Sequence, residues 1–125
     1  MGDSYKVLVV DDSPFIFKAV RKALEPNGFQ MVGHAENGKI GLEMVDQFQP
    51  DLITLDVTMP VMDGLETAKN LFLKNSKTKI IMLSAMGDED LMKQAGHYGV
   101  KNFISKPFKA EELLDLVRSM LDVKV

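Results

Sequence analysis

Five residues that could do chemistry each follow a short apolar stretch of the chain. They are Asp11, Asp12, Asp56, Ser84 and Lys106. Carboxylates held close together raise one another's pKa, and a hard divalent cation such as Mg²⁺ relieves this repulsion. A carboxylate beside such a cation can attack phosphorus, while a hydroxyl and an ammonium can bind the phosphoryl oxygens. If the fold gathers these residues, they predict a phosphoryl-transfer site with Asp56 as the nucleophile.

The element that carries Asp56 begins at Leu52 and runs into a loop closed by Pro60. Runs of Val, Leu and Ile bounded by turn residues are typical of strands that are covered on both faces, as in a parallel sheet. Burying a lone carboxylate is costly unless a partner charge or a metal compensates. We therefore expect Asp56 to lie beside a cation.

Four further apolar stretches predict strands of the same sheet. With the stretch that ends at Asp56, the predicted strands are 5–10, 30–35, 52–56, 79–83 and 102–105. The second is the weakest of the five and is expected near an edge of the sheet.

Apolar residues at three- and four-residue spacing predict a helix after each strand. Ser13 before Pro14 is a typical helix start, and Asp63 before Gly64 is interpreted as another. Asp88 is expected to cap the fourth helix, predicted over 89–98. Gly96 should weaken that helix by about 1 kcal/mol relative to alanine.

Strands that alternate with helices predict a doubly wound α/β fold with right-handed crossovers. In such folds function gathers beyond the carboxyl ends of the strands, at the switch point of the winding. Four of the five predicted strands end at the candidate residues. The sequence therefore predicts three carboxylates, a hydroxyl and an ammonium on one rim of the sheet.

Composition narrows the class of protein. The chain has 125 residues, 46% of them hydrophobic and 26% charged, as in one globular domain. A net charge of −3 gives no broad attraction to nucleic acid or to a membrane surface. Cysteine is absent, no apolar run approaches the roughly 20 residues that span a bilayer, and the polar N-terminus does not resemble a signal peptide. We expect a single cytoplasmic domain over residues 1–125.

Four motifs resemble the receiver domain of two-component response regulators, and most closely the stand-alone receivers of chemotaxis. They are Val9-Val10-Asp11-Asp12-Ser13, Leu55-Asp56-Val57-Thr58-Met59-Pro60-Val61-Met62-Asp63-Gly64, Leu83-Ser84-Ala85 and Lys106-Pro107-Phe108. Their order and spacing fit the family from Lys6 to Leu121. The resemblance implies a (βα)5 flavodoxin-like three-layer sandwich, whose parallel five-stranded sheet has the strand order 2-1-3-4-5.

The resemblance also implies roles for the candidate residues. Asp56 would accept a phosphoryl group from a histidine kinase, and Ser84 and Lys106 would bind the phosphoryl oxygens. The ligands of Mg²⁺, for which Mn²⁺ can substitute, would be Asp11, Asp12, Asp56 and the backbone carbonyl of Thr58. The Lys106-Pro107 peptide bond is expected to be cis.

A receiver of this kind would act as a signalling module that catalyses only its own phosphorylation and dephosphorylation. Ser84 and Phe103 are the implied switch residues, and the fourth helix, fifth strand and fifth helix form the implied output surface. The expected partners are a histidine kinase and a downstream protein, such as a flagellar motor switch, or a phosphatase. No direct nucleic-acid or membrane contact is expected, and the protein should be a monomer without an attached output domain.

Three other interpretations remain open at this point. The chain could be a receiver from a longer transcriptional or other regulator. A phosphohydrolase of the haloacid dehalogenase type also uses an aspartate at a strand end, but it wants a second acid two residues later, where Thr58 stands. A flavodoxin-like cofactor site is disfavoured because the first turn, at Asp11 and Asp12, is acidic where a phosphate loop supplies backbone amides.

The sequence around two histidines and two phenylalanines indicates their roles less specifically. His34 and His97 have no second His or Cys at ligand spacing, so both are interpreted as structural or surface residues. Phe15 and Phe17 flank the apolar stripe of the first helix, and at least one of them should be exposed. Kinase docking is the functional alternative to ordinary partial burial for this pair.

Overall fold

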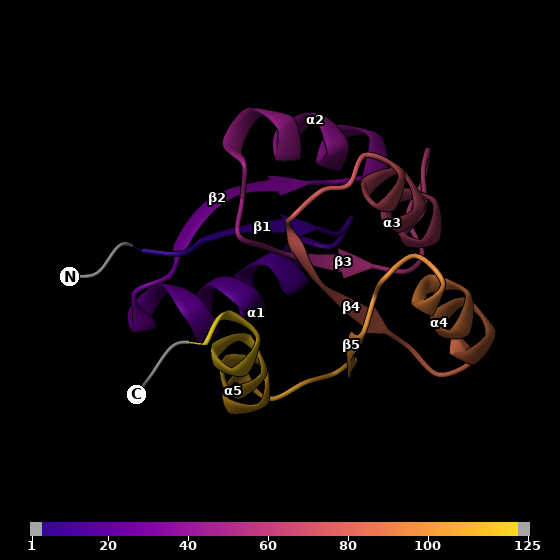
Figure 1. Cartoon of the computed structure of the whole chain (residues 1–125). Coiled ribbons are helices and arrows are strands. Elements are labelled where there is room, and N and C mark those ends of the chain that lie inside the picture. Colours follow the sequence, from indigo (N-terminus) through magenta and orange to yellow (C-terminus); the bar gives the residue numbers. More distant parts are fainter. Residues whose placement is uncertain (1–3, 123–125) are drawn as a thin grey trace.

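The computed structural model describes residues 4–122 and contains one parallel five-stranded sheet (Figure 1). Its strands lie in the order β2-β1-β3-β4-β5, which confirms the predicted topology. β2 lies at one edge, as predicted for the weakest strand. The strands are β1 (Lys6–Val10), β2 (Gln30–Ala35), β3 (Leu52–Asp56), β4 (Lys79–Ser84) and β5 (Asn102–Ser105).

Helices cover both faces of the sheet. They are α1 (Pro14–Leu24), α2 (Gly38–Phe48), α3 (Gly64–Leu73), α4 (Glu89–Gly96) and α5 (Ala110–Leu121), and a short 3-10 helix η1 (Glu25–Asn27) follows α1. In Figure 1, α1 and α5 lie below the sheet, α2 and α3 lie above it, and α4 stands at its right-hand end. Among the described residues, no helix is long and apolar enough to cross a membrane.

Two hydrophobic cores result from the alternation of side chains along the strands. Val7 and Val9 of β1 belong to the core shared with α1 and α5, whereas Leu8 and Val10 belong to the core shared with α2, α3 and α4. β3 lies at the centre of the sheet, and all five of its residues are buried. The strand that carries Asp56 is therefore covered on both faces, as its apolar sequence predicts.

Side-chain caps begin three of the helices, two of them at the predicted residues Ser13 and Asp63. The Ser13 hydroxyl, the Asn37 side-chain carbonyl and the Asp63 carboxylate each accept a hydrogen bond from the backbone N–H three residues later. These caps satisfy N–H groups that have no partner inside the helix. The interpretation of Asp63 as a helix start is thus confirmed.

The fourth helix begins at Glu89, as predicted, but its cap and its C-terminal end differ from the prediction. Asp88 is the N-cap residue, as predicted, but its carboxylate accepts the Ala85 N–H at 2.8 Å and no N–H of the helix. The helix ends at Gly96 rather than at residue 98. Gly99 adopts a left-handed φ of 83°, and the Val100 N–H returns to the Ala95 carbonyl at 3.2 Å. This turn closes the helix early, since glycine reaches positive φ without a steric penalty.

A buried hydroxyl without a partner lies in the middle of β3. Thr54 is fully buried between Val9 and Ile81 of the neighbouring strands. Its Oγ1 is one of two buried side-chain oxygens in residues 4–122 that have no hydrogen-bond partner. By contrast, the Thr67 hydroxyl is equally buried and donates to the Asp63 carbonyl at 2.7 Å. The two threonines therefore form a matched pair.

We expect Thr54→Val to raise the free energy of unfolding by about 1 kcal/mol, because valine has the same shape and removes an unpaired polar group. Thr67→Val should lower it by about 1 kcal/mol, because a hydrogen bond is lost. Chemical denaturation of the two variants and the wild type measures both changes. Equal effects of the two substitutions would contradict the assignment of Thr54 as unpaired.

Candidate phosphoryl-transfer site

Three carboxylates meet at the carboxyl edge of the sheet. Asp11 and Asp12 follow β1, Asp56 ends the adjacent β3, and one carboxylate oxygen from each lies within 4.8 Å of the other two. Asp11 is fully buried and Asp56 is 8% exposed, whereas Asp12 is exposed. The rim predicted from the strand ends is therefore present, with two buried acids and one that faces solvent.

Lys106 supplies the cation that the buried acids require. Its Nζ donates a hydrogen bond of 2.9 Å to Asp56 Oδ1 and lies 3.2 Å from Asp11 Oδ2. The residue follows β5, and its backbone N–H is held by the Ser84 carbonyl at 2.8 Å. The next peptide bond, between Lys106 and Pro107, is cis, as predicted. One ammonium thus joins two acids that come from different strands.

The acids and the lysine change one another's protonation. Burial raises the pKa of Asp56, and the nearby charges of Asp11 and Asp12 raise it further, against the lowering effect of the bond to Lys106. Burial alone would lower the pKa of Lys106, but the bond to Asp56 and the charges of both acids raise it overall. The Lys106 ammonium therefore stays charged. The ionised form of Asp56 is less favourable in the folded protein than it would be in water.

The donor set fits a hard divalent cation. Asp11 Oδ2 is buried and accepts no well-directed hydrogen bond, although the Lys106 ammonium lies 3.2 Å away as an ion pair. A buried carboxylate oxygen that accepts no hydrogen bond is unusual, and it can take a further positive partner beside the ammonium. Three carboxylates with one solvent-facing member match the preference of Mg²⁺ for a few carboxylates plus water. No soft ligand is available in this cluster.

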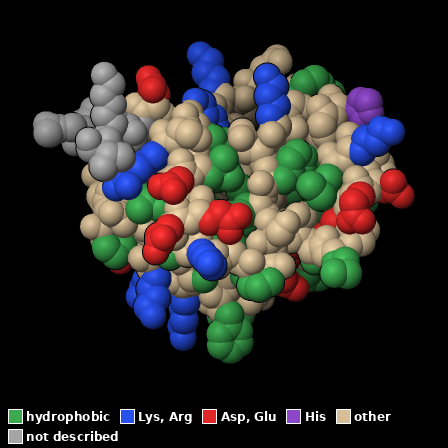
Figure 2. Space-filling view, turned by 90° about the horizontal axis from the view of Figure 1, so that it is seen from below, with side chains coloured by type: hydrophobic (Ala, Val, Ile, Leu, Met, Phe, Trp, Pro, Cys, Tyr) green, Lys and Arg blue, Asp and Glu red, His purple; other side chains and the backbone are tan. Residues whose placement is uncertain are grey.

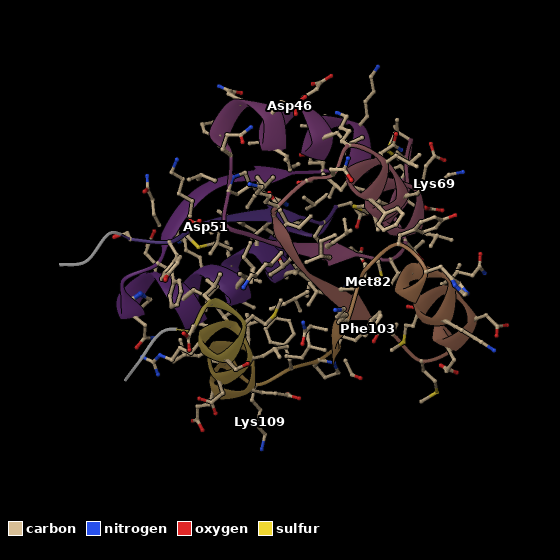
Figure 3. The ribbon with its side chains drawn as sticks, viewed as in Figure 1. Asp46, Asp51, Lys69, Met82, Phe103 and Lys109 are labelled. Atoms are coloured by element: carbon tan, nitrogen blue, oxygen red, sulfur yellow. The ribbon has the colours of Figure 1, made fainter. Side chains whose placement is uncertain are left out.

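The remaining predicted site residues have weaker contacts, and Ser84 and Thr58 lie at or beyond the carboxyl ends of their strands whereas Phe103 lies within β5. The Ser84 hydroxyl is buried at the end of β4 and donates a long bond of 3.5 Å to the Ile104 carbonyl. Thr58 is exposed in the loop after β3. Phe103 is half-buried on β5 opposite Met82 of β4, as Figure 3 shows, and packs against the core shared with α2, α3 and α4.

The loop that follows Asp56 is held tightly to the end of β3. The Gly64 N–H donates to the Val57 carbonyl at 2.8 Å, which folds the loop back on itself. A Cβ atom at Gly64 would overlap the backbone carbonyl of Asp56. Glycine is therefore required at this close approach, and the packing of α3 fixes the backbone that carries Asp56.

Sequence reasoning missed one residue of the site, His34. Its Nε2 atom lies 2.6 Å from the backbone carbonyl oxygen of Asp11. A search for metal ligands could not reveal this contact, because the partner is a backbone atom. Phe17, which the sequence suggested for docking, is half-buried against this imidazole, while Phe15 is 79% exposed.

Comparisons with known proteins agree on the family. Residues 7–118 match the model of the response regulator receiver domain. The chain is 38% identical to the chemotaxis protein CheY of Bacillus subtilis over 119 residues, covering 95% of this chain and 99% of that protein. The chain therefore belongs to the receiver-domain family of response regulators. Within this family it is a CheY-like receiver.

Solved structures support the same assignment. The receiver domain of Thermotoga maritima CheB superposes with a TM-score of 0.85 at 30% identity, covering 98% of this chain and all of that one. The Borrelia burgdorferi structure of CheX with CheY, BeF3 and Mg²⁺ matches with a TM-score of 0.87 at 34% identity, covering 96% of this chain and 90% of that one. The flavodoxin-like α/β fold predicted from the sequence is thus confirmed.

The raised pKa of Asp56 predicts a pH-dependent effect of Asp56→Asn in metal-free buffer. A carboxyl whose pKa is higher in the folded protein contributes stability at low pH, and this contribution is lost as the pH rises through the raised pKa. The unfolding free energy of Asp56→Asn minus that of the wild type should therefore increase with pH across this range. Denaturant unfolding in EDTA at a series of pH values measures the difference.

Asp46→Asn provides the baseline for this experiment, because Asp46 is exposed on α2 (Figure 3), pairs with the exposed Lys74 and does not belong to the cluster of three carboxylates. The unfolding free energy of Asp56→Asn minus that of the wild type should not stay flat or fall with rising pH. Either result would show that the folded protein does not disfavour the ionised Asp56 carboxylate.

Proposed function

We propose that this receiver accepts a phosphoryl group from a histidine kinase on Asp56, with Mg²⁺ bound by the acidic cluster. The observation that carries the proposal is the bridge of Lys106 between Asp11 and Asp56 beside an exposed third acid. This arrangement supplies a nucleophile whose ionised form is disfavoured, Asp56, together with the ammonium of Lys106 and a cluster of carboxylates that can bind a divalent cation. Each of the three is needed to neutralise and align a phosphoryl group.

The chemical step follows from the positions of these groups. An oxygen of Asp56 attacks phosphorus, the bond to the kinase histidine nitrogen breaks, and its electron pair leaves with that nitrogen. Lys106 Nζ, now 2.9 Å from Asp56 Oδ1, would stay beside the new phosphoryl oxygens. The Ser84 hydroxyl, held only by a bond of 3.5 Å, would turn to donate to them. Bound Mg²⁺ would supply positive charge to the same oxygens.

The metal ligands in this proposal are Asp11, Asp12, Asp56 and the backbone carbonyl of Thr58. The Borrelia CheY in the solved complex is accompanied by Mg²⁺ and BeF3, and this chain is 34% identical to it. The likeness supports Mg²⁺ as the cation here. Mn²⁺ has the same preference for carboxylate and water ligands and could substitute.

The output would pass through the surface of α4, β5 and α5. α4 has only eight residues and one fully buried residue, Ala95, so it is anchored weakly to the rest of the fold. Phe103 on β5 is half-buried and could turn further inward once Ser84 moves. A phosphoryl group adds about −1.5 to −2 charge and would bias such a two-state element.

We propose a protein as the target of this surface, such as a flagellar motor switch or a phosphatase, rather than nucleic acid. Figure 2 shows the face that lies lowest in Figure 1, on which acidic and basic side chains are interspersed from the centre to the edge. The mixed charges offer no single-sign field on this face, and the net charge is −3. Phosphate-backbone binding relies on a basic surface.

The direct test is incubation with acetyl phosphate and Mg²⁺, followed by intact mass measurement. The wild type should gain the mass of one phosphoryl group, and Asp56→Asn should gain none, because the nucleophile is removed. Asp46→Asn serves as the matched control and should be modified like the wild type. An unmodified wild type, or a modified Asp56→Asn, would refute the proposed function.

Phosphate lifetime gives a further prediction. Thr58 and Met86 lie two residues after Asp56 and Ser84, both are exposed, and neither offers a carboxylate or amide to position the attacking water. Thr58→Asn and Met86→Glu should each shorten the half-life of the phosphorylated protein severalfold. Loss of the phosphoryl mass with time measures the half-life, and unchanged decay in both variants would count against this role.

A further inference from the structure

His34 contacts the polypeptide between two residues of the acidic cluster. It lies on the edge strand β2 and is half-buried. Its Nε2 atom is 2.6 Å from the carbonyl oxygen of Asp11. Because a carbonyl oxygen can only accept, the imidazole must donate from Nε2. This carbonyl belongs to the peptide group that joins Asp11 to Asp12.

Strand pairing explains why the imidazole reaches this carbonyl. His34 is the register partner of Val9 in the parallel pair of β2 and β1, so both side chains point to the face covered by α1. One residue further, the Asp11 N–H donates to the Ala35 carbonyl at 2.9 Å. Both backbone groups of Asp11 are therefore bound to β2, one through its main chain and one through a side chain.

The imidazole ring is itself fixed by stacking. The Phe17 ring of α1 lies parallel to it, with 4.7 Å between the centroids and 1° between the planes. The Arg21 guanidinium lies 5.9 Å from the centroid of the Phe17 ring. Such contacts restrict rotation of the ring about its side-chain bonds. The donor is thus held toward the carbonyl before any ligand binds.

The side chains of Asp11 and Asp12 differ in how they are held. Asp11 Oδ1 accepts the Ser13 N–H at 2.9 Å, and Asp11 Oδ2 lies 3.2 Å from Lys106 Nζ. The Asp12 carboxylate is exposed and, among the described residues, takes part in no side-chain hydrogen bond or ion pair. The plane of the Asp11–Asp12 peptide group therefore influences where the Asp12 Cα–Cβ bond points, and so which region the Asp12 carboxylate can reach.

We propose that His34 is a positioning residue for the cation site. By holding the Asp11 carbonyl, it fixes the peptide plane that helps to set the direction of the Asp12 Cα–Cβ bond relative to Asp11 and Asp56. The Asp12 carboxylate then reaches the cation by side-chain rotation without a change of the backbone, which raises the affinity. The inference rests on one part of the proposed function, which is the binding of Mg²⁺ by the acidic cluster.

Two substitutions of His34 distinguish the effect of its hydrogen bond to the Asp11 carbonyl from the effect of its stacking on Phe17. His34→Phe keeps a ring that can stack on Phe17 but has no N–H, whereas His34→Gln loses the ring and keeps a side-chain N–H of similar reach. Calorimetric titration of the unphosphorylated chain with Mg²⁺ measures the affinity. We expect His34→Phe to weaken Mg²⁺ binding about tenfold, and His34→Gln to stay within about threefold of the wild type.

His97→Phe is the matched control, because His97 is exposed beyond the end of α4. It should bind Mg²⁺ like the wild type. Phosphorylation by acetyl phosphate adds a kinetic readout. The rate for His34→Phe should fall at limiting Mg²⁺ and recover at saturating Mg²⁺, since the variant alters cation binding and leaves the nucleophile in place.

Nuclear magnetic resonance tests the contact without any metal. In EDTA, at a pH where the imidazole is neutral, the wild type should show His34 with its proton on Nε2. The Asp12 amide resonance should shift in His34→Phe and return toward the wild-type position in His34→Gln. A proton on Nδ1 instead would overturn the proposal without the use of any variant.

The outcomes distinguish the two proposals. If the wild type binds Mg²⁺ and His34→Phe binds within about twofold of it, the positioning role is refuted and the proposed function stands. If His34→Gln loses as much affinity as His34→Phe, ring packing rather than donation is responsible, and the positioning proposal also fails. A wild type that binds no Mg²⁺ would overturn both.

Discussion

The ion pair that Lys106 forms with Asp11 and Asp56 is the interaction on which this structure depends. Two buried carboxylates face one ammonium, and a third carboxylate stands at the surface. Burying an unpaired charge is costly, and like charges at this separation oppose ionisation. The lysine compensates part of this cost, and Asp11 Oδ2 remains without a well-directed donor. The folded protein therefore holds a site that is prepared for additional positive charge.

The fold creates this condition through its topology. β1 and β3 are neighbours in a parallel sheet, so their carboxyl ends bring Asp11 and Asp56 side by side. Lys106 comes from beyond β5, and the bond from its N–H to the Ser84 carbonyl ties it to the end of β4. Four strands thus contribute to one small site. A change at the site can reach β4, β5 and the helices attached to them.

Much of this arrangement could be predicted from the sequence. The bounds of β2 and β5 agree with the prediction, because short apolar runs between turn residues have few alternatives in an α/β chain. The rim of acids could be predicted because parallel strands end at the same edge. The Lys106-Pro107 cis bond came from the family resemblance and not from the residues themselves.

Other features depended on contacts that no sequence pattern encodes. Asp88 carries a typical capping side chain, yet its carboxylate turns back to the Ala85 N–H. The importance of His34 arises from its register beside Val9 and from a backbone acceptor on another strand. The missing hydrogen-bond partner of the Thr54 hydroxyl could not be predicted either, because threonine is common in strands. Each case is decided by tertiary geometry at the level of single atoms.

Thermal unfolding as a function of Mg²⁺ concentration tests whether a divalent cation relieves the repulsion within the acidic cluster. The unfolding midpoint of the wild type should rise with Mg²⁺ concentration as for one site, with a stabilisation of about 2.7 kcal/mol at 100 times the dissociation constant. Asp12→Asn should reduce this rise. A wild-type midpoint that does not move with Mg²⁺, or a rise that Asp12→Asn leaves unchanged, would refute cation binding by this cluster.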